Sequence, residues 1–125
     1  MSKAITITAL LTTAIVALGG FHHFTSIHAQ AEPFDRHQWR DRQAAAQQND
    51  PGCVRGGMAL SLQQSKSLSN RSRAETLGLL GEPDAKPEGQ LRYNLGQCHW
   101  DWRHSALVVS FDANGLVEHT AIETQ

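Results

Sequence analysis

The chain has 125 residues with 12 acidic and 11 basic side chains, which gives a formal net charge of −1. Residues 32–125 hold all 12 acidic and 10 of the 11 basic residues, so their charge is 10 − 12, or −2. This balance gives no electrostatic case for binding nucleic acid or an anionic lipid surface, and the length allows one small domain with a modest core.

The N-terminal residues have the pattern of an export signal. Lys3 gives a short positive region, residues 4–20 are uncharged and mainly apolar, and Ala29-Gln30-Ala31 has the A-x-A form of a cleavage site. We therefore predict a signal peptide over residues 1–31, cleaved after Ala31, and a periplasmic or secreted protein. The alternative is an uncleaved transmembrane anchor, because the 17 residues 4–20 lie at the lower edge of what spans a bilayer.

Residues 32–52 are polar and poor in aliphatic side chains, so we predict a flexible linker or a frayed helix outside the core. Phe34 and Trp39 are the only large apolar anchors, and residues 43–48 favour a helix. Asp50-Pro51-Gly52 is a turn signal. The folded domain is therefore expected to cover residues 53–125.

Two cysteines, Cys53 and Cys98, are the only ones in the chain. An even number of cysteines in a small exported domain predicts a disulfide, which would stabilise a modest core. The alternative is two separate buried thiols.

Two short helices are predicted next. Val54, Met58 and Leu62 are spaced four residues apart, which suits one face of a first helix. A second helix begins at a capping box, in which Ser72 accepts a hydrogen bond from the Glu75 amide. The expected apolar face of this helix consists of Ala74, Leu77 and Leu80. The helix is expected to end at Gly81, which can take the left-handed conformation, because Pro83 prevents its continuation.

Three strands follow the helices. Leu91, Tyr93 and Leu95 alternate with polar residues, as in a half-buried strand, and residues 107–111 alternate in the same way. The connection Asp112–Gly115 predicts a hairpin, because Asn and Gly tolerate positive φ, and residues 116–122 return as the last strand. The predicted fold is α+β, with two short helices packed on a three-stranded antiparallel sheet in the order α-α-β-β-β.

Three motifs occur in order in the C-terminal half: RAETLGLLGEPD at residues 73–84, Tyr93 with Leu95-Gly96, and a strand and hairpin at residues 107–115. Their order resembles the BamE-like family of small envelope proteins, also called the SmpA/OmlA type, over roughly residues 58–122. The resemblance implies a two-layer α+β domain in the cell envelope that acts as an assembly factor, a lipoprotein or a protein-binding inhibitor, mostly without catalysis. The chain departs from the lipoprotein members because no cysteine comes directly after the apolar run of the leader.

The densest group of chemically active side chains lies in residues 98–104, CHWDWRH. His99, Asp101 and His104, with Cys98 or His119, could ligate a metal ion, and this gives the alternative hypothesis of a metal-binding or stress-response protein. Their spacing matches no established ligand pattern, so solvated loop histidines are the favoured interpretation and we predict no bound metal or cofactor.

Trp100 and Trp102 are two residues apart, so on a strand they would share a face, with Arg103 opposite. Trp and Arg are enriched at protein interfaces, which makes these three residues the candidate partner-binding site. The competing interpretation is burial of both indoles, with Trp39 as one possible neighbour.

No catalytic grouping is evident, since the chain has no G-x-S-x-G elbow, no C-x-x-C pair and no glycine-rich phosphate loop. We therefore expect a protein that is not an enzyme, has no small-molecule substrate and binds another envelope protein. A purely structural role is the third hypothesis.

Overall fold

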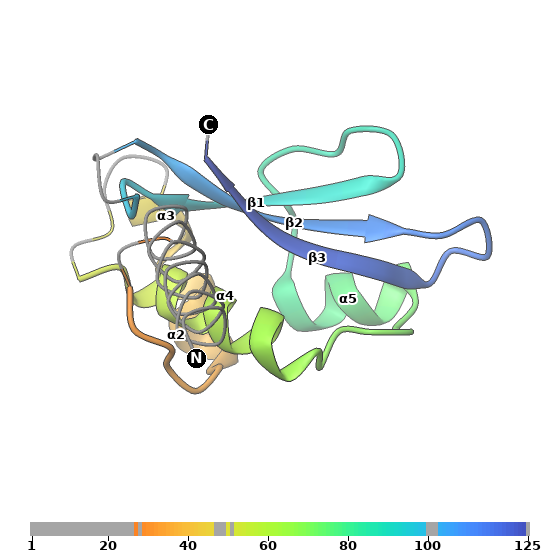
Figure 1. Cartoon of the computed structure of the whole chain (residues 1–125), viewed down its shortest axis with the longest axis horizontal. Coiled ribbons are helices and arrows are strands. Elements are labelled where there is room, and N and C mark those ends of the chain that lie inside the picture. The colour runs from red at the N-terminus through yellow and green to blue at the C-terminus, as the bar shows by residue number, and fades with distance from the viewer. Residues whose placement is uncertain (1–26, 28, 47–49, 51, 100–102, 125) are drawn as a thin grey trace, which may run out of the picture.

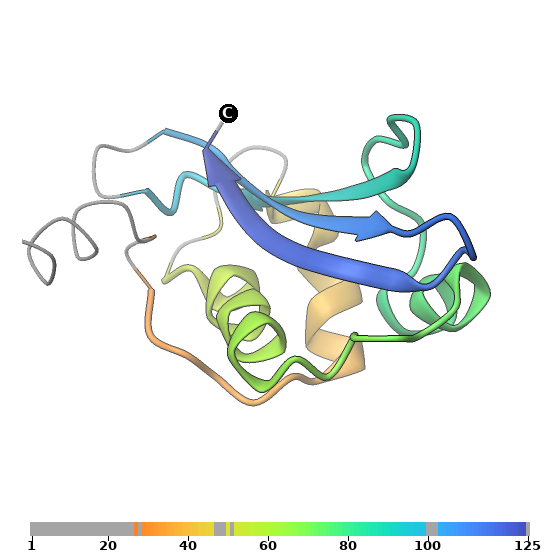
Figure 2. The same ribbon diagram turned by 45° about the vertical axis from the view of Figure 1, so that its right-hand side comes forward.

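The computed structural model describes residues 27, 29–46, 50, 52–99 and 103–124. In chain order the elements are α2 (Arg36–Asp41), α3 (Gln43–Ala46), α4 (Val54–Ser65), α5 (Arg73–Leu80), β1 (Gln90–Gly96), β2 (Ser105–Phe111) and β3 (Val117–Thr124). The sheet forms one layer and the helices lie against one of its faces (Figures 1 and 2). The predicted α+β fold is confirmed. Two short helices, α2 and α3, precede the two predicted ones, and α3 lies within residues 43–48, where the sequence favours a helix.

The sheet has the strand order β1-β2-β3, and both neighbouring pairs are antiparallel. Leu91 pairs with Val109 and Tyr93 with Leu107, so the predicted alternation places apolar side chains on the helix-facing side. These four residues are fully buried. The core beneath them is completed by α4, whose Met58 and Leu62 are buried as the sequence spacing predicts.

The connection between β2 and β3 is the predicted turn, but the interactions that stabilise it differ from those expected. Asp112 Oδ1 accepts hydrogen bonds from the Asn114 and Leu116 amides at 2.8 and 3.0 Å. Gly115 has a φ of +77°, whereas Asn114 is not among the residues with positive φ. The expectation that both Asn and Gly use positive φ is therefore wrong for Asn114, because the Asp112 carboxylate stabilises the turn instead.

Helix α5 begins as predicted and buries a different face. Ser72 Oγ accepts a hydrogen bond from the Glu75 amide at 3.1 Å. Leu80 is buried and Leu77 half-buried, but Ala74 is exposed and Thr76 takes the inward position. The expectation for Ala74 is wrong because Thr76 and Leu80, four residues apart, form the face toward the core, and the Thr76 hydroxyl donates to the Ser72 carbonyl at 2.8 Å.

The end of α5 also differs in detail from the prediction. Gly81 has the expected positive φ of +80°, but its ψ of −167° lies outside the left-handed helical region. Its amide donates to the Leu77 carbonyl at 2.8 Å. Glycine is therefore used here for a sharp exit from the helix into an extended segment.

Replacing Ser72 with alanine should lower the free energy of unfolding by about 1 kcal/mol, because the Glu75 amide would lose its acceptor at the helix N-terminus. Urea unfolding followed by circular dichroism measures this change. Ser72→Asp is the matched control and should be close to the parent protein, since aspartate caps helices equally well. Equal losses in both variants would show that Ser72 is needed for another reason.

The segment 32–52 contributes to the core, so the prediction that it lies outside the core is wrong. Trp39, on α2, is 0% exposed, and Ala46 and Asp50 are also buried. The Trp39 indole nitrogen donates to the Leu80 carbonyl at 2.9 Å. The average polarity of the segment misled the prediction, because a single aromatic side chain can bury about 150–250 Å² of surface and anchor an otherwise polar segment.

The N-terminal predictions fall mainly outside the described residues, which include only Ile27 and residues 29–31 of the predicted leader. Cleavage after Ala31 and the anchor alternative stay predictions. In the part of the chain that the structure describes, no helix has the length and apolarity to cross a membrane.

Candidate functional site

A disulfide joins Cys53 to Cys98, as the cysteine count predicts. Cys53 precedes α4 and Cys98 follows β1, so the bond ties the helix layer to the end of the sheet. The two Cα atoms are 5.7 Å apart. The thiol pair is therefore unable to serve as a metal ligand or a nucleophile while the bond is intact.

Two residues after Cys53, Arg55 is a charged side chain with 0% exposure. Its guanidinium carbon lies 4.1 Å from the centre of the Trp39 ring, and its Nη1 donates to the Asn94 carbonyl at 2.9 Å. The Asp84 carboxylate is 3.7 Å from the same nitrogen. Its Nε has no hydrogen-bond partner among the described residues. Arg55 thus connects α4 with α2, β1 and the loop before β1.

Asp50 occupies a second buried position beside Arg55. Its Oδ2 accepts a hydrogen bond from the Arg55 amide at 2.8 Å, close to the N-terminus of α4, where a negative charge is favoured. Its Oδ1 lies 3.3 Å from Arg42 Nη1. Gly96 has a φ of +81°, and a Cβ there would come within 2.8 Å of the Asp50 amide nitrogen. The bulge at Gly96 in β1 therefore makes room for Asp50.

Burial sets the electrostatics of this cluster, which we call the Arg55 cluster (Trp39, Asp50, Arg55, Asp84 and Tyr93). Desolvation lowers the pKa of the Arg55 guanidinium below its ordinary value, and the charges of Asp84 and Asp50 oppose that shift. Desolvation raises the pKa of the Tyr93 hydroxyl, and the positive charge of Arg55 opposes the rise. The Tyr93 hydroxyl donates to the Gly81 carbonyl at 2.9 Å. These contacts bind the groups to one another, so the cluster is a structural junction between the two layers.

The raised pKa of Tyr93 predicts a loss of stability in alkali. The unfolded chain releases the tyrosine proton near pH ~10 while the folded protein retains it, so the free energy of unfolding should fall above that pH by up to about 1.4 kcal/mol per pH unit. Tyr93 is the only tyrosine. Its ionisation can therefore be followed by ultraviolet absorbance, alongside urea unfolding at each pH.

Tyr93→Phe is the control, and its stability should depend much less on pH in this range. Ionisation of Tyr93 in the folded protein at its ordinary pKa would contradict the interpretation.

The predicted partner-binding and metal residues are only partly described. Trp100, Asp101 and Trp102 lie outside the described residues. Arg103 is exposed, and its carbonyl accepts a hydrogen bond from the His99 amide at 3.4 Å, so the two ends of the connection between β1 and β2 are close together. His99 is buried, and His104 half-buried.

His119, the remaining metal candidate, is exposed on β3. Among the residues whose placement is described, no group of three or more His, Cys, Asp or Glu side chains is placed to hold a metal ion. Because Asp101 is outside that set, metal binding by His99, Asp101 and His104 is not tested by this finding.

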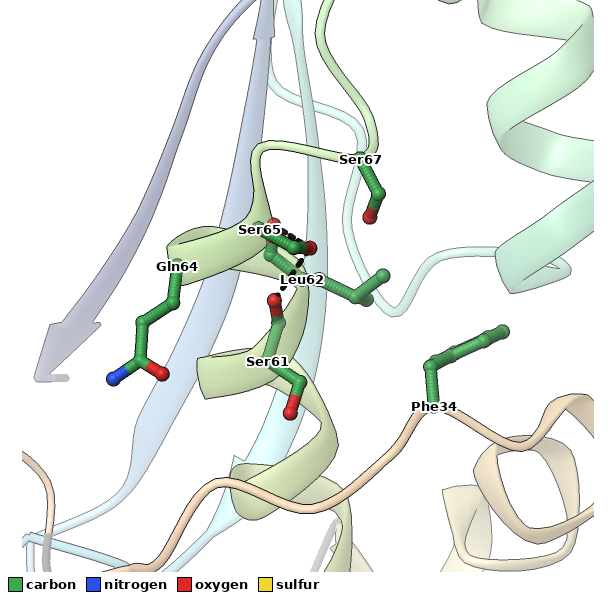
Figure 3. A pocket seen from close by; sticks show the side chains of 6 residues that line it. All are labelled: Phe34, Ser61, Leu62, Gln64, Ser65 and Ser67. Carbon is green, nitrogen blue, oxygen red and sulfur yellow. Dashed lines mark hydrogen bonds between the residues drawn. The ribbon is translucent and has the colours of Figure 1, made fainter.

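A shallow pocket of about 430 Å³ lies beside the C-terminal half of α4. Figure 3 shows its two apolar lining residues, Phe34 on the segment before α2 and Leu62 on α4. The other lining residues are polar: Ser61, Gln64, Ser65 and Ser67. The Ser65 hydroxyl donates a hydrogen bond to the Ser61 carbonyl at 2.7 Å. A mixture of apolar and polar side chains is also typical of protein interfaces. The pocket was not predicted from the sequence because Phe34 was assigned to the linker.

Comparison with protein-family models, with curated proteins and with solved structures found no match. The described geometry defines the chain as a disulfide-bonded, two-layer α+β domain. The BamE-like resemblance stays a prediction from the sequence motifs.

Proposed function

We propose that this is an exported, BamE-like protein of the cell envelope that works by binding another envelope protein and catalyses no reaction. The observation that carries the proposal is the Cys53–Cys98 disulfide within a domain of this size. Disulfides persist in oxidising compartments such as the periplasm, and small exported domains use them to supplement a modest core. The leader pattern at residues 1–31 supports the same location.

The connection between β1 and β2 is the candidate contact surface. One end is fixed by the disulfide at Cys98, and the hydrogen bond from the His99 amide to the Arg103 carbonyl brings the other end beside it. Trp100 and Trp102 stand between these two points in the sequence, and Arg103 is exposed. Aromatic and arginine side chains on a connection with fixed ends would contact a partner with little loss of conformational entropy.

The location is tested by alkylation of freshly exported protein, before and after reduction. We expect both cysteines to resist alkylation until a reductant is added. Thiols that react at once would remove the support for an oxidising compartment.

The binding function is tested by crosslinking in intact cells, followed by affinity measurement with the purified partner. Trp100→Ala combined with Trp102→Ala should weaken that affinity by about 30-fold or more, which corresponds to about 2 kcal/mol. His119→Ala, an exposed change on β3, is the control and should leave the affinity unchanged. Equal affinity of all three proteins would exclude the tryptophans as the contact, and the absence of any envelope partner would overturn the function.

A further inference from the structure

The last described residues of the predicted leader pack against α4. Ile27 is only 8% exposed and forms an isolated antiparallel bridge with His99. Farther along, the Glu32 amide donates to the Gly57 carbonyl at 3.0 Å. Figures 1 and 2 show this segment, in orange, passing beside α4. We call Ile27 and residues 29–32 the N-terminal strap.

The close approach of the strap to α4 requires a residue without a side chain at position 57. A Cβ atom on Gly57 would overlap the carbonyl oxygen of Gln30, which is backbone and has little freedom to move aside. A Cβ on the neighbouring Gly56 would meet only ordinary contacts, 3.4 Å from Ile27 Cδ1 and 3.5 Å from Cys98 Sγ. Glycine weakens a helix relative to alanine, so its use at position 57 needs a reason, and the close passage of an extended chain supplies one.

The strap shows what kind of chain fits this surface. It places one aliphatic side chain beside the disulfide and Gly56, and it pairs its backbone with His99. It also brings a backbone carbonyl against Gly57, where no side chain stands in the way. Extended peptides are recognised in this way, with main-chain pairing for affinity and a pocket for an alternate side chain for specificity.

The predicted cleavage after Ala31 would remove most of the strap, including Ile27 and Gln30. Glu32 would remain and could still donate to the Gly57 carbonyl through its new terminal amine. We propose that the surface formed by Gly56, Gly57, Cys98 and His99, which we call the glycine surface, binds an extended segment of a partner envelope protein with an aliphatic residue in the place of Ile27. The strap covers this surface until cleavage removes it. This inference rests on the proposed export and partner binding.

The test uses the exported, cleaved protein, with its N-terminus confirmed by mass spectrometry, and a synthetic peptide with the sequence of residues 24–31. We expect the peptide to bind, and an Ile27→Asp version of it to bind at least tenfold more weakly.

In the protein, Gly57→Ala should reduce binding at least tenfold. Gly78→Ala is the matched control, because it also puts alanine inside a helix but a Cβ there meets nothing within 4 Å, and it should bind like the parent. Both variants should melt no lower than the parent, because alanine favours the helix and Gln30 is gone. The Glu32 side chain, whose Cγ would lie 3.1 Å from a Cβ on Gly57, is flexible and can move aside.

Several results would overturn the inference. One is equal binding by the Gly57→Ala and Gly78→Ala proteins, and another is equal binding of the two peptides. A dimer that Gly57→Ala dissociates would assign the glycine surface to a second copy of this chain. An exported protein that keeps residues 27–31 would make the strap a permanent part of the domain. In that last case the proposed function would stand, because export, the disulfide and partner binding are measured separately.

Discussion

Replacing Arg55 with alanine should lower the free energy of unfolding by about 3–5 kcal/mol, the range for breaking a buried ion pair by removing one partner. The Asp84 carboxylate, whose side chain is only 8% exposed, would lose its buried cation, and the Asn94 carbonyl would lose a donor. The Trp39 ring would lose the guanidinium stacked on it. Urea unfolding followed by tryptophan fluorescence measures the loss. It is large for a domain of this size, whose total stability is of the order of 5–15 kcal/mol.

Two further variants separate the charge of Arg55 from its shape. Arg55→Lys keeps the charge but replaces the flat guanidinium with an ammonium group, so it should be only partly destabilised. Arg55→Met with Asp84→Asn removes both charges and keeps the volume, and it should be more stable than Arg55→Ala. If Arg55→Ala lowered the free energy of unfolding by less than about 1 kcal/mol, the effect would be that of an exposed ion pair. Such a result would contradict the role of the Arg55 cluster as a buried junction between the layers.

Local patterns predicted the elements of this fold well. The capping box at Ser72 and the alternation in Leu91–Leu95 depend on residues close in sequence, and the structure shows both. The disulfide was predictable because only one pairing exists for two cysteines. These features need no knowledge of how distant segments meet.

The Arg55 cluster was not predictable in the same way, because its members meet only in the folded chain. Arg55 contacts Trp39 on one side and Asp84 on the other, and those two residues are far apart in sequence. A charged residue in a weakly amphipathic helix is ordinarily assigned to the solvent side. The available signal was the lone Trp39 in a polar segment, since a large aromatic residue without apolar neighbours needs a distant partner.

The glycine surface had a weak signal in the sequence, namely the adjacent Gly56 and Gly57 inside a predicted helix. In the sequence alone these glycines make the start of that helix uncertain, and they lack the spacing of a phosphate-binding loop. Their meaning depends on the approach of Gln30 to Gly57, a contact between the leader and the domain. A boundary placed at residue 53 separated the two partners, so the contact could not be anticipated.

Replacing both Cys53 and Cys98 with alanine should lower the free energy of unfolding by about 4 kcal/mol, from the chain entropy that a bond closing a loop of this length removes from the unfolded state. The two cysteines are 45 residues apart, and that interval contains both long helices and all of β1. Cys98 is buried, and the bond holds the start of α4 near the end of β1, two residues from Arg55. Thermal and urea unfolding of the double variant measure the loss.

Reduction of the parent protein is the matched control, because it opens the same loop without changing the sequence. The reduced parent and the double variant should have nearly equal stabilities, and the reductant should leave the double variant unchanged. The stability of both should also fall more on replacement of Arg55 than that of the oxidised parent does. Without the disulfide, only noncovalent contacts between α4 and β1 hold the two layers together. If the double variant keeps the stability of the parent to within about 1 kcal/mol, the entropic gain from closing the loop must be offset elsewhere, and the bond would not be what supplements this small core.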